Sequence, residues 1–247
     1  MRWVVLQWRA SLIGRWLCLL VCHPADGDLR KLLRGCQSKN IKLTSAEQLT
    51  LVAPVASGFA YMEDHRYVHM DIAARNCLVG AHNNVKIADF GMSRKLEENE
   101  DHWTGPASLK IPVKWCAPEV ISEKMFSHAS DVWSYGIMVW EVLAYGEMPM
   151  KGINNVAVSQ SLQKGYRCPA PPGCDGETYE QLKKMWSYER AERPTFEEVH
   201  SNLMAILRKM PEKRDVRLQS PHPPCVSGQC FAKASAATAI PTPGRFC

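Results

Sequence analysis

The chain has 247 residues, of which 46% are hydrophobic and 22% are charged, and this is the composition of an ordinary globular protein. It excludes a collagen-like, a coiled-coil and a wholly disordered chain. The net charge is +5, and residues 208–247 carry all of this excess with seven Lys or Arg and two Asp or Glu. The remaining residues are neutral overall, which argues against a nucleic-acid partner, because nucleic acids bind a basic face.

The start of the chain is apolar but too short to cross a membrane. Its longest apolar run, Trp16–Cys22, has seven residues, whereas a spanning helix needs about 18 or more. Residues 1–22 resemble a secretory signal loosely, yet Arg9 and Arg15 interrupt them and no small-residue cleavage site follows. Ten cysteines without a CxxC pair favour reduced thiols. We therefore expect a cytoplasmic protein without a membrane span, with secretion as the alternative.

The middle of the chain is predicted to be mostly helical. Thr44 and Glu47 form a capping-box pair at the start of a helix that runs to about Met62. Pro54 lies inside this helix, where a proline removes a hydrogen bond and clashes with the preceding turn. We therefore expect the helix to be disrupted at this residue.

Two short β segments follow, CLVG from Cys77 and VKIAD from Val85, and residues 90–118 are predicted to be irregular. Residues 131–145 are apolar on almost all sides, which is typical of a helix that is buried all round. Gly146 is expected to end this helix.

The last helix is predicted to start near Thr195, with Glu198 completing a second capping box, and to end at about Lys209. From Pro211 the chain is rich in Pro, Ser and Ala and poor in large apolar residues. Such a segment buries too little surface to offset its ordering entropy, so we expect a disordered tail.

Five motifs occur in order along the chain. They are HMDIAARNCLV at 69–79, ADFG at 88–91, PVKWCAPEV at 112–120, SDVWSYG at 130–136 and ERPTF at 192–196. Together they identify the chain as similar to the protein kinases, and specifically to their C-terminal lobe.

The resemblance implies a mainly α fold with short β pieces around the catalytic and DFG segments. It divides the chain into three parts. Residues 1–22 are a remnant of small-lobe strands or an atypical start, residues 23–209 are the C-lobe, and residues 210–247 are the disordered tail.

The resemblance also implies the chemistry of four residues. Asp71 matches the catalytic base, which accepts the proton of a substrate hydroxyl, and Arg75 matches an arginine that contacts the base and the substrate. Asn76 and Asp89 match the two ligands of Mg²⁺, and Asp89 bridges this ion to the phosphates of ATP. The family thus implies ATP and Mg²⁺ as cofactors.

The residues after the base resemble those of tyrosine kinases. IAARN follows Asp71, with Ala73 where serine/threonine kinases usually have a lysine, and PVKW precedes the APE. The spacing from Ser93 to Pro112, together with GYRCPAPPGC at 165–174, resembles the spleen-tyrosine-kinase group. The implied substrate is a tyrosine of a protein.

Other positions match the nucleotide-binding face of the family. Gly27-Asp28-Leu29 resembles the end of the hinge between the lobes, which makes Val21 the gatekeeper and places Cys22 and Pro24 beside adenine. Pro24 lacks the N–H that normally meets adenine. Leu78 would form the floor of the adenine pocket.

Three further matches are structural. Glu119 and Arg193 are expected to form a buried ion pair. Asp131 is expected to hold the backbone of the loop at His69, and Asp28 to cap the helix that follows it.

The sequence departs from the kinase pattern in the groups that hold phosphate. The 247 residues contain no GxGxxG loop, no VAIK-like lysine and no helix glutamate to hold such a lysine. Met70 replaces the arginine that, in the family, binds a phosphate on the activation segment, which corresponds to residues 89–119 here. Residues 89–119 contain no tyrosine, and His102 and Trp103 occupy the positions of paired tyrosines in relatives.

Four acidic residues in the same segment could replace the negative charge of a phosphate group: Glu97, Glu98, Glu100 and Asp101. Without an arginine at position 70 they have no expected partner, so we interpret them as solvated surface. We interpret Thr104 and Ser108 as ordinary loop hydroxyls, with phosphorylation as the alternative.

The missing small-lobe motifs also predict an exposed apolar patch on the upper face of the lobe. There Phe90 and His69 are expected to lose the apolar neighbours on which they stack in relatives.

Three interpretations stay open. The intact Asp71, Arg75, Asn76 and Asp89 favour an ATP-dependent protein-tyrosine kinase. Packing residues retained without an ATP lid favour a pseudokinase-like module that binds a kinase or a substrate protein. The Trp- and Arg-rich start and the tail favour an incomplete chain.

Overall fold

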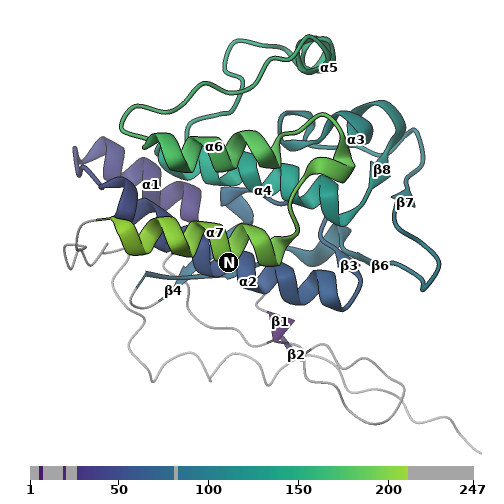
Figure 1. Ribbon diagram of the computed structural model, residues 1–247, viewed down its shortest axis with the longest axis horizontal. Coiled ribbons are helices and arrows are strands. Elements are labelled where there is room, and N and C mark those ends of the chain that lie inside the picture. Colours follow the sequence, from purple (N-terminus) through teal and green to yellow (C-terminus); the bar gives the residue numbers. More distant parts are fainter. Residues whose placement is uncertain (1–5, 8–18, 21–26, 81–82, 211–247) are drawn as a thin grey trace, which may run out of the picture.

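The computed structural model of the chain, shown in Figure 1, describes residues 6–7, 19–20, 27–80 and 83–210. Three positions predicted to line the adenine site lie outside the described residues, as does the tail from residue 211. These positions are Val21, Cys22 and Pro24.

Two short strands are described near the start. β1 (Leu6–Gln7) and β2 (Leu19–Leu20) pair in antiparallel fashion, with Leu6 opposite Leu20. β2 lies within the apolar run that the sequence suggests as a strand remnant.

The first two long helices begin where the sequence predicts. The carboxylate of Asp28 accepts a backbone N–H from the first turn of α1 (Leu29–Ser38) at 2.9 Å. At the start of α2 (Ser45–Asp64), Thr44 accepts the N–H of Glu47 at 3.2 Å, and the Glu47 carboxylate accepts that of Thr44 at 2.6 Å. Both predicted caps are confirmed.

The expected disruption of α2 at Pro54 is wrong, because the helix continues without a break on both sides of the proline. Pro54 lies on the exposed side of α2, and its carbonyl accepts the hydroxyl of Ser57 at 2.7 Å. The proline ring therefore lies outside the core, and the helix loses one backbone hydrogen bond, to the carbonyl four residues earlier, without ending there.

Capping boxes also begin α4 (His128–Leu143) and α7 (Phe196–Lys209). Thr195 and Glu198 hold the start of α7, as predicted. Ser127 and Ser130 play the same part at α4, where a serine takes the place of the usual acidic residue.

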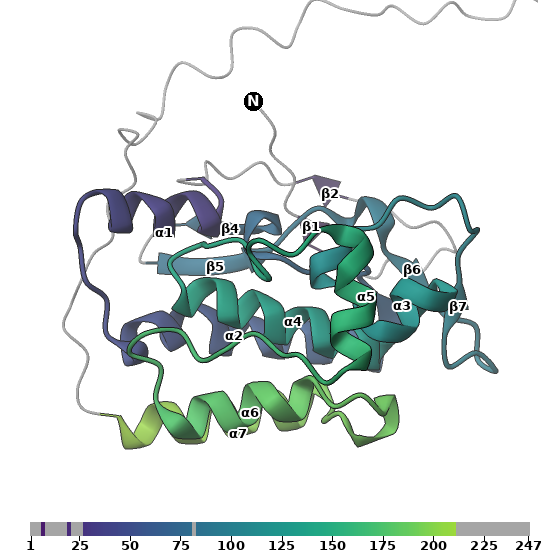
Figure 2. The same ribbon diagram turned by 90° about the horizontal axis from the view of Figure 1, so that it is seen from above.

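The helices are arranged in layers with α2 and α4 in the middle, as Figure 2 shows. On one side α7 packs against α2, and α6 (Gly176–Met185) packs against α4; on the other side lies the β4–β5 hairpin. Helix α4 is buried along most of its length, as its apolar sequence predicts. Two further helices are α3 (Pro118–Glu123) and α5 (Asn155–Gln163).

The strands form short antiparallel pairs. β4 (Cys77–Gly80) and β5 (Asn84–Ile87) are the predicted hairpin, with Cys77 opposite Ile87. The other pairs are β3 (Tyr67–Val68) with β6 (Arg94–Lys95) and β7 (Trp103–Thr104) with β8 (Met125–Phe126). Of these strands, β6 and β7 lie within the segment predicted to be irregular. These strands are so short that the fold is mainly α, as predicted.

An aromatic cluster joins the layers. The ring centroid of Phe59 in α2 lies 5.1 Å from that of Phe196 in α7 and 5.9 Å from that of Tyr135 in α4. The Tyr135 hydroxyl donates to the carbonyl of Val52 at 2.9 Å. Aromatic pairs at such distances stabilise by about 0.5–1.5 kcal/mol beyond their burial. The cluster therefore fixes α4 and α7 on α2, beneath the loop that carries the site.

Candidate active site

The catalytic loop, residues 69–76, is anchored by helix α4. Asp131, in the first turn of α4, accepts the backbone N–H of His69 at 2.6 Å and that of Met70 at 3.0 Å. Burial raises the pKa of Asp131 to about 7, and the two N–H groups act in the opposite direction. The predicted contact between Asp131 and this loop is confirmed.

Met70, at a position where the family resemblance implies an arginine, is packed into the core. Its residue is 6% exposed and its backbone has φ +69°, in the left-handed region that non-glycine residues rarely adopt. The contact of its N–H with Asp131 helps to hold this conformation. The loop thus keeps its path with a methionine at this position, and the methionine offers no group that binds phosphate.

The carboxylate of Asp71 is held on both of its oxygens. Arg75 pairs with Oδ1, and Nδ2 of Asn76 donates to Oδ2 at 2.7 Å and to the carbonyl of Asp71 at 2.7 Å. The Asp71 side chain is 18% exposed, so solvent or a substrate can reach it. A carboxylate oxygen has two lone pairs, and Asp71 therefore retains the capacity to accept a proton from a hydroxyl group.

Asn76 and Asp89 offer oxygens that fit Mg²⁺. Nδ2 of Asn76 makes the hydrogen bonds to Asp71, which leaves Oδ1 as a donor to a metal. Asp89 is exposed, and its loop is tied to Asn76 because the N–H of Ala88 donates to the Asn76 carbonyl at 2.9 Å. No group of three or more acidic, His or Cys side chains among the described residues could hold a metal by itself. A magnesium ion here would rely on water and phosphate oxygens as well, as this ion commonly does.

His69 connects the catalytic loop to the loop of Asp89. Its Nδ1 accepts the N–H of Asp71 at 3.3 Å, and its Nε2 lies 3.2 Å from the carbonyl of Ala88. These contacts assign the proton to Nε2, since a carbonyl can only accept. Burial lowers the pKa of His69. The neutral ring thus fixes the position of Asp71 relative to the DFG loop, residues 89–91.

The expected loss of stacking partners is wrong for His69. Its residue is 1% exposed, and its ring centroid lies 5.8 Å from that of Phe59 and 5.2 Å from that of Phe90. Phe90 itself is half-buried and packs against the core. The two side chains cover each other, which the sequence does not reveal.

Glu141 supports the base from behind and is the functional residue that the sequence analysis misses. The guanidinium of Arg75 lies 4.7 Å from the ring centroid of Trp115, whose Nε1 donates to Glu141 Oε2 at 2.7 Å. The same oxygen accepts the N–H of Ala74 at 3.0 Å, and Glu141 is fully buried. Burial raises the pKa of Glu141. A carboxylate in the apolar second half of α4 is the signal that could have revealed it.

Leu78 lies next to the end of the predicted hinge. It pairs with Asp28 in an isolated antiparallel bridge, and the N–H of Val79 donates to the carbonyl of Gly27 at 3.0 Å. Leu78 is half-buried. The structure therefore brings Leu78 to the hinge, and its contact with adenine stays a prediction.

The predicted ion pair of Glu119 with Arg193 is confirmed. Two guanidinium nitrogens of Arg193 meet the two carboxylate oxygens of Glu119 at 2.6 and 2.9 Å. The side chain of Arg193 is 0% exposed and also donates to the carbonyls of Ser187 and Ala129. This bidentate pair fixes the end of the activation segment to the loop before α7.

Comparison with known proteins agrees with this geometry. Residues 4–203 match the family of protein tyrosine and serine/threonine kinases. The chain belongs to this family, and its similarity to the tyrosine-protein kinases described next supports a fold of the tyrosine-kinase type.

Three relatives are tyrosine-type kinases or ephrin receptors. Human tyrosine-protein kinase FRK is 45% identical over 172 residues, which cover 69% of this chain and 34% of FRK. Drosophila melanogaster tyrosine-protein kinase Abl is 40% identical over 179 residues, 72% of this chain and 11% of Abl. Human ephrin type-A receptor 8 is 38% identical over 211 residues, 85% of this chain and 21% of the receptor. The chain thus spans about a third or less of these three relatives. No helix among the described residues is long and apolar enough to cross a membrane.

Proposed function

We propose that the chain is a protein-tyrosine kinase domain that transfers the γ-phosphoryl group of ATP to a tyrosine hydroxyl of a protein substrate. The arrangement around Asp71 carries this proposal. Its carboxylate is fixed by Arg75 and Asn76, and Asp89 lies on a loop that is joined to Asn76 and to His69.

In this proposal Asp71 accepts the proton of the tyrosine hydroxyl as the oxygen bonds to the γ-phosphorus and the bond to ADP breaks. Arg75 holds the carboxylate toward the substrate, and Trp115 with Glu141 keeps Arg75 in place. Asn76 Oδ1 and the Asp89 carboxylate would hold Mg²⁺. The magnesium complex of ATP, when bound, supplies the phosphoryl group and neutralises its charge.

In this proposal, these 247 residues catalyse phosphoryl transfer at a low rate. Their sequence has no Gly-rich loop and no strand lysine to clamp the phosphates, and such preorganised charge is usually the largest contribution to catalysis. The described site supplies the base and the metal ligands, which orient the hydroxyl and the ion.

A binding function is the second proposal, and the buried Met70 favours it. The structural contacts of Asp131 and of Glu119 with Arg193 are intact, whereas the residue that would read a phosphate on the activation segment is an apolar side chain in the core. A lobe of this kind could dock a kinase or a substrate protein. The cytoplasmic location and the protein partners stay predictions.

The test is phosphorylation of a tyrosine-containing peptide by the purified chain with Mg²⁺ and ATP. Tyrosine phosphate should form slowly, and Asp71→Asn should lower the rate by about 10²–10⁴-fold because the base is lost. Asp64→Asn, on the exposed end of α2, is the matched control and should leave the rate unchanged. If the wild type forms no tyrosine phosphate, or if Asp71→Asn forms it equally fast, the kinase proposal fails and the binding proposal remains.

A further inference from the structure

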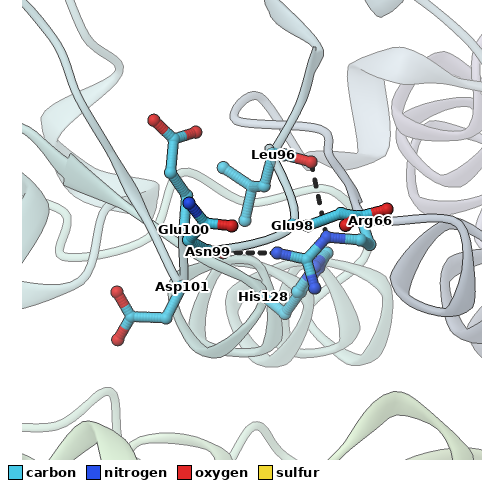
Figure 3. Close-up of a pocket in the computed structure, with 7 residues that line it drawn as sticks. All are labelled: Arg66, Leu96, Glu98, Asn99, Glu100, Asp101 and His128. Atoms are coloured by element: carbon cyan, nitrogen blue, oxygen red, sulfur yellow. Dashed lines mark hydrogen bonds between the residues drawn. The ribbon is translucent and has the colours of Figure 1, made fainter.

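The first half of the activation segment contains the acidic loop, residues 97–101. The side chain of Arg66 binds backbone carbonyls in and next to this loop. Arg66 follows α2 and has φ +62°. Its Nη2 donates to the carbonyls of Glu97 and Glu100, the latter at 2.6 Å, and its Nε lies 3.4 Å from the carbonyl of Leu96. Figure 3 shows the Arg66 guanidinium pointing toward this loop. Arg66 and the loop line a pocket of about 380 Å³. Hydrogen bonds from a charged donor are stronger than neutral ones.

The acidic loop also closes on itself. The carboxylate of Glu100 accepts the N–H of Glu97 at 3.1 Å, and the N–H of Glu100 donates to the carbonyl of Glu97 at 3.0 Å. The loop therefore forms a compact turn in which the carbonyls of Glu97 and Glu100 face Arg66. The backbone of Arg66 also contacts this region, because its carbonyl accepts the N–H of Leu96 at 2.8 Å.

A second arginine binds the far end of the acidic loop. Arg190, in the short helix Arg190–Glu192, forms an ion pair with Asp101 at 3.0 Å. The hydrogen bond from His102 and the charge of Arg190 hold the pKa of Asp101 below its usual range. The side chain of Asp101 is 72% exposed, which agrees with its interpretation as solvated surface, and its partners are Arg190 and His102. Glu98 makes no hydrogen bond or ion pair with the described residues.

A third arginine contacts Trp103, at a position where the family resemblance implies a tyrosine. The guanidinium of Arg94 in β6 lies 4.1 Å from the Trp103 ring centroid, a distance typical of a cation–π contact. On its strand, Trp103 pairs with Phe126 of β8, and the two ring centroids are 5.8 Å apart. The guanidinium of Arg94 thus contacts a side chain of the chain itself, which needs no modification to be present.

We propose that the activation segment of this chain is held folded by Arg66, Arg190 and Arg94, and that its order requires no phosphate. Each arginine binds a group that is always present: backbone carbonyls, the carboxylate of Asp101 and the ring of Trp103. Met70 and the absence of tyrosine from residues 89–119 agree with this, because a segment held in this way needs neither a phosphate nor an arginine at position 70.

Hydrogen–deuterium exchange of residues 94–105, followed by mass spectrometry on the full chain, tests this proposal without any need for kinase activity. The untreated chain and the phosphatase-treated chain should exchange equally slowly. Faster exchange after phosphatase treatment would show that a phosphate, on Thr104 or Ser108 for example, orders the segment. Exchange as fast as that of an unstructured peptide in the wild type would equally overturn the proposal.

A charge exchange isolates the ion pair. Arg190→Asp should raise the exchange rate of the segment by about 2–5-fold, as expected for a surface pair, and addition of Asp101→Arg should restore the slow rate. Glu98→Gln is the matched control and should change nothing. If the double variant exchanges as fast as Arg190→Asp alone, the pair does not order the segment.

Arg66→Gln should have the larger effect, about tenfold or more, because three carbonyls lose a charged donor. Lys110→Gln, an exposed cation on the same segment, is its control. If Arg66→Gln does not fold, Arg190→Asp and its combination with Asp101→Arg still test the proposal. Unchanged exchange in a folded Arg66→Gln variant would contradict the part assigned to Arg66.

Discussion

The catalytic loop and the acidic loop of the activation segment are held by opposite chemistry. Buried carboxylates of α4, Asp131 and Glu141, accept backbone N–H groups of the catalytic loop. Two guanidinium groups nearer the surface bind the acidic loop: Arg66 donates to backbone carbonyls, and Arg190 pairs with the carboxylate of Asp101. Buried anchors without an alternative partner are costly to remove, whereas exposed ones compete with water. The two regions should therefore respond differently to substitution.

The largest effect is expected at Asp131. Asp131→Ala leaves the N–H groups of His69 and Met70 buried and unpaired, and each such group costs about 1–3 kcal/mol of folding free energy. Asp131→Asn keeps one acceptor oxygen and should be less destabilising. In urea unfolding, the free energy of unfolding should fall from the wild type to Asp131→Asn and again to Asp131→Ala. Equal stability of the wild type and Asp131→Ala would show that α4 does not anchor the loop.

Glu141 should come next. Glu141→Leu removes the acceptor for Trp115 Nε1 and Ala74 N, and we expect a loss of about 1–3 kcal/mol for each donor left unpaired. Glu141→Gln keeps an acceptor oxygen of the same shape and should cost much less. The free energy of unfolding in urea is measured for the two variants. A Gln variant as unstable as the Leu variant would mean that charge, rather than hydrogen bonding, is what Glu141 supplies.

The pH dependence of stability tests the buried His69. Because burial lowers its pKa in the folded state, the unfolded chain binds more protons as the pH falls below about 6.5, and stability is lost in that range. His69→Phe removes this proton uptake at position 69, along with the hydrogen bond to Ala88. The variant should be less stable than the wild type at pH 7.5, and the difference should shrink toward pH 5. A difference that stays constant from pH 7.5 to 5 would contradict the neutral, buried ring.

The smallest effect on stability is expected in the activation segment. Asp101→Asn removes one surface ion pair and should change the free energy of unfolding by about 0.2–1 kcal/mol, well below the effect of Asp131→Ala. Thermal unfolding of the two variants side by side measures this ratio. If Asp101→Asn proves as destabilising as Asp131→Ala, the distinction between buried and surface anchors is wrong.

The sequence predicts what depends on neighbouring residues. The caps at Thr44 and Thr195 follow from residues three positions apart, and the buried helix from an apolar run. The motif residues Asp71, Asn76 and Asp89 are brought to adjacent loops, as the resemblance implies.

What the sequence misses depends on contacts between distant residues. The partner of Asp101 is Arg190, 89 positions away, and the partners of Glu141 are 67 and 26 positions away. Pro54 is misjudged because its effect depends on which side of α2 faces solvent. No local pattern encodes these relations.

The most direct test of the account is nucleotide binding by the site that Asp71, Asn76 and Asp89 form. Thermal unfolding of the purified chain with and without millimolar ATP and Mg²⁺ should show a shift that requires magnesium, since a ligand at ten times its Kd stabilises by about 1.4 kcal/mol. Asp89→Asn should lose this shift, and Asp64→Asn should keep it. A folded wild type without any shift, or an Asp89→Asn variant with the same shift, would contradict the assignment of these residues to the magnesium complex of ATP.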